Sequence, residues 1–155
     1  MIDQPPTTSL VLRLATLEDM TYVEELDRLS TSPTREIHRD IEKYFGSVDP
    51  STHEHTFIFL AFLSGVAAAK AELMVSLVDA SNSIGYIKRV IVHPNFRSKG
   101  LATLLMQHII NFAHTEQKLN AIDLHVWEGN QSAIHLYESL GFALQHRELY
   151  YRLLL

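Results

Sequence analysis

The residues best suited to chemistry begin in a short basic segment, residues 93–102 (HPNFRSKGLA). Gly100 stands where a helix is predicted to start, and its missing side chain lets the backbone approach a ligand closely. The first N–H groups of a helix have no intrahelical partner and lie at the positive end of the helix dipole. Together with the cations Arg97 and Lys99, these groups could bind the phosphates of a cofactor.

The same segment has a simpler interpretation, in which Gly100 forms a turn and the two basic side chains are solvated. On this feature alone the simpler interpretation is favoured. Two common phosphate-binding loops are absent, because the sequence contains neither GxxxxGK[ST] nor GxGxxG. Their absence excludes the commonest alternative phosphate sites.

A second segment, residues 130–142 (NQSAIHLYESLGF), combines a helix start with a tyrosine. Asn130 is a good N-cap, which would be its purely structural role. Tyr137 follows seven residues later, almost two turns along, and therefore lies on the same helix face about 10 Å further on. On spacing alone such a tyrosine is more often a packing residue than a catalyst.

The elements that must position these segments follow from hydrophobic periodicity. Residues 66–78 (VAAAKAELMVSLV) contain helix formers, but we interpret them as a strand because short apolar strands flank them. The resulting order is βααβββαβαβ, an α/β (α+β) mixed sheet flanked by helices, in a single domain over residues 1–155. The predicted strands are 10–14, 56–63, 66–78, 84–92, 121–127 and one or two within 142–154, and the predicted helices begin at 17, 33, 101 and 132.

Both segments resemble motifs of one family. Residues 97–102 (RSKGLA) match R/Q-x-x-G-x-G/A of the GNAT acetyltransferase superfamily, with Ala102 at the second glycine position. They follow a typical strand end and His93-Pro94, and residues 130–142 resemble the downstream block of that family. The element order is similar over nearly the whole chain, although the first eighty residues match by pattern only. The sequence therefore resembles a GNAT superfamily N-acetyltransferase.

The resemblance implies a GNAT-like acyl-CoA N-acyltransferase fold, in which the fourth and fifth strands separate and acetyl-CoA, or another acyl-CoA, lies between them as co-substrate. The pantetheine arm would hydrogen-bond like an added strand to the backbone of the fourth strand. The pyrophosphate would be bound by the loop amides. The implied cofactor-binding residues are Val90, Ile91, Val92, Arg97, Ser98, Lys99, Gly100, Leu101, Ala102, Thr103 and Asn130.

The implied reaction is direct attack of a neutral amine on the thioester carbonyl, without a covalent acyl-enzyme. An alkyl amine with a pKa of about 10 must lose a proton, and the departing thiolate leaves more easily when it is protonated. Tyr137 has a hydroxyl that can donate and is the predicted general acid. A backbone N–H near Val92 would hold the oxyanion.

The proton acceptor is less well defined by the sequence. His125 lies on the fifth strand and points opposite to Leu124 and Val126, so it could face the cleft. Some bacterial N-terminal acetyltransferases of this family carry a glutamate at the aligned position. Glu72 and Tyr86 on neighbouring strands are alternatives, and an ordered water could relay the proton.

The composition limits the function classes. The chain has no cysteine, which excludes a disulfide framework and a thiol nucleophile, and its net charge of -5 argues against nucleic-acid and membrane partners. The N-terminal residues lack the features of a targeting segment, so we expect a cytoplasmic protein. No metal is expected, since His53-Glu54-His55 does not have the HExxH spacing.

The sequence thus predicts an enzyme that moves an acetyl group from acetyl-CoA to a primary amine of a small molecule or peptide. The family habit also allows a homodimer. The alternative function is a regulatory module that binds acyl-CoA without turnover, which the unsettled proton acceptor leaves open.

Overall fold

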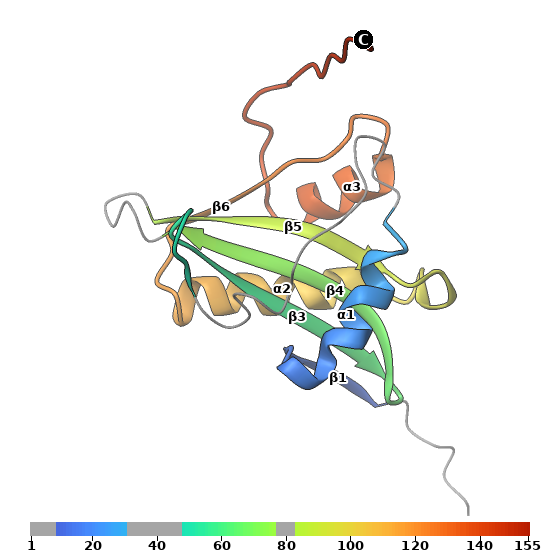
Figure 1. Ribbon diagram of the computed structural model, residues 1–155. Helices are drawn as coiled ribbons and strands as arrows, with labels where there is room; N and C mark the ends of the chain where they lie inside the picture. Colours follow the sequence, from blue (N-terminus) through green and yellow to red (C-terminus); the bar gives the residue numbers. More distant parts are fainter. Residues whose placement is uncertain (1–8, 31–47, 77–82) are drawn as a thin grey trace, which may run out of the picture. The chain divides into compact units, whose positions relative to one another are not determined.

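The computed structural model describes residues 9–30, 48–76 and 83–155 (Figure 1). The chain divides into two compact units, Met1–His125 and Val126–Leu155, and each is described by itself. The helix predicted from residue 33 lies outside the described residues, as do the last two residues of the strand predicted over 66–78.

The first unit is built on one mixed sheet. Its strands lie in the order β1-β3-β4-β5-β6, with the short strand β2 paired to β3. All neighbours are antiparallel except β5 and β6, which are parallel. The strands are β1 (Leu10–Leu14), β2 (Val48–Asp49), β3 (Glu54–Leu63), β4 (Val66–Ser76), β5 (Ile84–Val92) and β6 (Ala121–Leu124). The predicted mixed sheet is confirmed, including the strand assignment of the ambiguous segment that forms β4.

Helices cover both faces of this sheet. A 3₁₀ turn, η1 (Leu17–Asp19), leads into α1 (Met20–Asp27) on one face, and α2 (Leu101–Thr115) lies on the other (Figure 1). A second 3₁₀ turn, η2 (Pro94–Phe96), follows β5. In the second unit the helix is α3 (Gln131–Ser139). No helix in the described part of the chain is long and apolar enough to cross a membrane.

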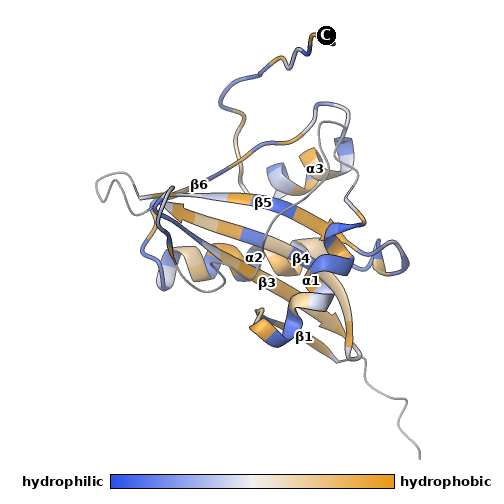
Figure 2. Ribbon diagram, in the orientation of Figure 1, coloured by the Kyte–Doolittle hydropathy of each residue, from blue (hydrophilic) through white to orange (hydrophobic). Residues whose placement is uncertain are grey.

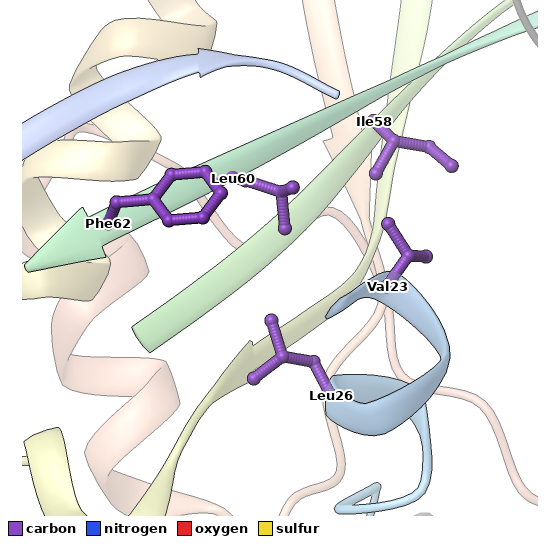
Figure 3. Close-up of a cluster of buried hydrophobic side chains, with 5 residues drawn as sticks. All are labelled: Val23, Leu26, Ile58, Leu60 and Phe62. Carbon is purple, nitrogen blue, oxygen red and sulfur yellow. The ribbon is translucent and has the colours of Figure 1, made fainter. Parts of the chain in front are cut away.

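Alternation along β3 divides the core into two layers. Even-numbered residues of β3 meet α1, where five side chains form a buried cluster: Val23, Leu26, Ile58, Leu60 and Phe62 (Figure 3). Odd-numbered residues face α2, and the ring of Phe59 packs edge-on against that of Phe112, with 5.1 Å between their centroids. Figure 2 shows the hydrophobic colouring along β3 that burial on both faces requires.

Two strand predictions were wrong, one in extent and one altogether. The strand predicted over 121–127 ends at Leu124, because its pairing with β5 ends at that residue. Residues 142–154 were predicted to contain one or two strands but have no regular secondary structure. A strand needs a neighbour for its backbone N–H and C=O groups, and a sequence pattern shows apolar residues without showing that neighbour.

A buried carboxylate joins β1 to the start of the first helix. Asp19 Oδ2 accepts hydrogen bonds from the backbone N–H and the hydroxyl of Thr16, at 2.7 and 3.1 Å. The guanidinium of Arg13 donates to both oxygens of the same carboxylate, at 2.7 and 3.0 Å. The hydrogen bonds from Arg13 are the main cause that lowers the pKa of Asp19 from 3.8 to about 2.

Asp19→Asn should therefore destabilise the protein by about 1.5–3 kcal/mol at neutral pH, the usual contribution of hydrogen bonds to a charged group. Because the folded-state pKa is depressed, this stabilisation is present above pH 3.8 and is lost as the pH falls toward 2. Urea denaturation of both proteins between pH 2 and 7 measures the difference. Glu18→Gln, at the exposed neighbouring position, is the control, and equal stabilities of Asp19→Asn and wild type at pH 7 would contradict the assignment.

Candidate active site

The loop between β5 and α2 has the geometry of an anion cradle. Ser98 and Gly100 both have positive φ angles, 61° and 75°. Gly100 is the N-cap of α2, and the first helical bond runs from the N–H of Leu104 to its carbonyl, at 3.1 Å. The N–H groups of Leu101, Ala102 and Thr103 precede that bond and therefore have no intrahelical acceptor.

The same loop is open on one side and anchored on the other. A Cβ added at Gly100 would meet no atom within 4 Å, so the space beside this backbone is open. Arg97, Ser98 and Lys99 are exposed. Leu101 is buried and fixes the first turn of α2 against the sheet. The predicted phosphate-binding residues thus lie together on an accessible helix N-terminus, as the sequence indicated.

The parallel ladder between β5 and β6 ends before β5 does. Its last pair is Ile87 with Leu124, whereas β5 continues to Val92. Within the described residues, β5 beyond Ile87 pairs only with β4. The two strands therefore stop pairing next to the loop that begins α2, which is the arrangement that the resemblance implied.

Backbone directions at the end of β5 follow from one hydrogen bond. The N–H of His93 donates to the carbonyl of Ala68 on β4, at 2.8 Å. Since successive residues of a strand point their polar groups to opposite edges, the N–H and C=O of Val92 point away from β4. The guanidinium Nε of Arg97 donates to this Val92 carbonyl, at 3.3 Å, and so connects the loop to the strand end.

Tyr86 and His125 meet beside the point where the strands stop pairing. The Tyr86 hydroxyl and His125 Nδ1 are 2.5 Å apart, although the residues are 39 positions apart in sequence. Tyr86 belongs to β5, and His125 follows directly after β6. When Nδ1 donates its hydrogen to the tyrosine oxygen, the lone pair of the imidazole is on Nε2, which can accept a proton.

Glu72, the other candidate acceptor, is in a different environment. Its side chain has 0% exposure, with Oε2 lying 2.5 Å from Lys70 Nζ and Oε1 3.3 Å from Arg89 Nη1. Lys70 Nζ also lies 2.5 Å from Asp27 Oδ1 on α1. A fully buried carboxylate between two cations has no exposed surface with which to meet a substrate amine. This burial argues against Glu72 as the group that accepts the proton of the amine.

Asn130 and Tyr137 belong to the second unit. Asn130 caps α3, because its Oδ1 accepts from the N–H of Ala133 at 3.3 Å. The Tyr137 ring packs edge-on against Phe142, with 5.9 Å between centroids. Burial raises the pKa of the Tyr137 hydroxyl, so this group stays protonated at neutral pH. A protonated hydroxyl can donate a hydrogen to a nearby acceptor.

Metal chemistry has no candidate site among the described residues, which contain no group of three or more histidine, aspartate or glutamate side chains that could hold an ion. His55 stacks on Phe57 instead, with 4.0 Å between ring centroids, and burial lowers the pKa of its imidazole.

Comparison with known proteins decides the family. A family model described as the acetyltransferase (GNAT) family matches residues 18–142, which include every candidate residue described above. The chain belongs to the GNAT acetyltransferase family. It is therefore an acyltransferase, and the predicted mixed sheet with flanking helices is the fold of its GNAT relatives.

The names of individual relatives refer to different amine acceptors. The spermidine N(1)-acetyltransferase of Escherichia coli K12 is 29% identical over 147 residues, covering 91% of this chain and 76% of that enzyme. The N-alpha-acetyltransferase 30 of Xenopus laevis is 30% identical over 122 residues, covering 77% of this chain and 44% of that protein. The structure of AAC(6')-Iy with a CoA-containing bisubstrate analogue superimposes with a TM-score of 0.72 at 18% sequence identity. The match covers 95% of this chain and 99% of that chain.

Sequence reasoning missed one set of residues in this GNAT protein, the buried network of Asp27, Lys70, Glu72 and Arg89. A signal was present, because Lys70 and Glu72 interrupt an otherwise apolar strand and are two residues apart. That spacing puts both side chains on one face of a strand, where they can pair. Asp27 and Arg89 carry no comparable signal, since their proximity depends on the tertiary structure.

Proposed function

We propose that this chain transfers an acetyl group from acetyl-CoA to a primary amine of a small molecule or a peptide, by direct attack of the amine. The observation that carries the proposal is the end of β5. There, pairing with β6 stops at Ile87, and the strand leads into a loop with two left-handed residues at the N-terminus of α2. The GNAT family model covers this region.

The backbone between β5 and α2 supports a role in holding acetyl-CoA, which would supply the activated thioester. Val90, Ile91 and Val92 would contact its pantetheine arm, with the Val92 backbone groups pointing away from β4. The amides from Arg97 to Thr103 would bind its phosphates, aided by the two exposed cations. The open space beside Gly100 and the positive φ angles fit such an anion.

Two groups of residues, each containing a tyrosine, would accept and donate the protons of the reaction. Tyr86 and His125 together would accept the proton of the incoming ammonium group, with His125 Nε2 as the accepting atom. This pair is favoured over Glu72, whose carboxylate is buried between Lys70 and Arg89. Tyr137 would donate a proton to the departing thiolate, since its hydroxyl is protonated at neutral pH.

Steady-state assays with an amine panel test the proposal directly. The panel contains spermidine, an aminoglycoside and a peptide with a free amino terminus. The released CoA thiol is measured, and mass spectrometry shows whether the acceptor has gained an acetyl group. Acetylation of any of them supports the proposal. Binding of acetyl-CoA without transfer to any acceptor would instead indicate a binding module, and absence of binding would refute the cofactor assignment.

Gly100→Glu should weaken CoA binding by at least about tenfold, because it places bulk and negative charge where the phosphates would bind. Gly65→Glu is a matched control, since Gly65 has a similar φ of 80° and its added Cβ also meets no atom within 4 Å. Both variants carry comparable backbone strain, but Gly65 lies in the β3–β4 turn. Calorimetric titration with CoA measures the affinities. Equally weakened CoA binding in both variants would contradict the assignment of the Gly100 loop to phosphate binding.

Tyr137→Phe should lower turnover by about 100-fold, the smaller end of the contribution of general acid catalysis. The dissociation constant of acetyl-CoA should change less than about twofold, because the removed hydroxyl acts on the leaving group. Tyr151→Phe, in the same unit and highly exposed, is the control. If Tyr137→Phe and Tyr151→Phe turn over at the same rate, Tyr137 is not the acid.

His125→Ala should lower turnover by about 100-fold. Tyr86→Phe should lower it by a smaller factor, since this change removes only the hydrogen bond that orients the imidazole. The double variant should be little worse than His125→Ala alone, because the two residues act as one unit. His135→Ala, an exposed histidine on α3, is the control. Independent, multiplicative losses in the double variant would show that the two side chains do not act together.

A further inference from the structure

Strand β5 contains a bulge that is occupied by a strained arginine. Ile91 pairs with Lys70 and Lys88 pairs with Glu72, so Arg89 and Val90 together stand opposite Ala71 alone. Arg89 has a φ of 51°. Glycine enters this left-handed region without steric penalty, whereas a residue with a Cβ does so only when its surroundings hold it there.

The bulge decides which backbone groups face the gap beyond Ile87. If the pairing of Lys88 with Glu72 continued without an extra residue, Val92 would stand opposite Ala68 and direct its N–H and C=O toward β4. The inserted residue reverses this parity. His93 takes the place opposite Ala68, as its hydrogen bond shows, and Val92 points to the other edge.

The side chain of Arg89 is held by a buried charge network. Its Nη1 lies 3.3 Å from Oε1 of Glu72, and the other carboxylate oxygen lies 2.5 Å from Lys70 Nζ. Lys70 also contacts Asp27, so two cations alternate with two carboxylates across α1, β4 and β5. Removing one charge would leave its neighbour buried without full compensation, so the ion pair opposes displacement of Arg89.

We propose that Arg89 and Glu72 are positioning residues for acyl transfer: their ion pair holds the bulge in its left-handed conformation and so aims the Val92 backbone at the thioester. This inference rests on the proposed function. In this role neither side chain would need to touch the substrate. Both act through the backbone of β5, which distinguishes them from Tyr86, His125 and Tyr137.

Paired substitutions at Arg89 separate a backbone role from a charge role. Arg89→Gly and Arg89→Ala remove the same ion pair, but only glycine accepts the positive φ. We expect Arg89→Ala to lower kcat/KM for acetyl-CoA by at least about tenfold relative to Arg89→Gly. Glu72→Gln should impair the wild type more than it impairs Arg89→Gly, because glycine no longer needs the ion pair to hold its conformation.

The controls use a second strained residue. Ser64, in the β3–β4 turn, has a φ of 50°. Ser64→Gly and Ser64→Ala should differ in thermal stability but have equal kcat/KM, which shows that strain alone does not alter turnover. If Arg89→Ala does not fold, Arg89→Asn and Arg89→Gln provide the comparison, since asparagine enters the left-handed region far more readily than most residues.

Equal kcat/KM values for the glycine and alanine variants, with a wild type that binds CoA and turns over, would overturn this inference and leave the proposed function intact. A wild type that neither binds CoA nor acetylates any amine would refute the proposed function and this inference with it. The expected order, glycine above alanine, supports both.

Discussion

An ammonium group buried in the middle of a sheet has to be neutralised, and much of the first unit is arranged around that requirement. Lys70 has no exposed surface and lies 2.5 Å from carboxylate oxygens of both Asp27 and Glu72. An isolated charge in such surroundings would be very costly. The requirement therefore fixes where the end of α1 sits on the sheet, and through Glu72 it extends to Arg89 in β5.

The sequence was most informative where periodicity is strict. Strands β1 and β5 and the start of α2 have the predicted bounds, because their apolar residues recur with one period and are flanked by clear stop signals. The loop at Gly100 was also predictable, since positive φ angles and helix N-termini leave a composition signal. Residues 142–154 were assigned wrongly, because exposed apolar residues in an extended segment look like strand residues in any sequence pattern.

Contacts between residues far apart in the chain could not be predicted from the sequence. Nothing in the order of residues places Tyr86 against His125, since their contact depends on the parallel register of β5 and β6. The bulge at Arg89 is likewise invisible, because arginine is not a residue that signals a left-handed conformation. Both features lie where β5 leaves β6, so local sequence patterns describe this part of the candidate site least.

The parallel pairing of β5 and β6 also has a consequence for the order in which this protein takes shape during synthesis. Strands β3, β4 and β5 form a meander of neighbouring hairpins, and α2 follows immediately. These contacts are close in sequence and can form early, whereas β6 must wait for the crossover through α2 to be completed. A nascent chain could thus form the β3–β4–β5 meander and α2 before His125 has emerged from the ribosome to contact Tyr86.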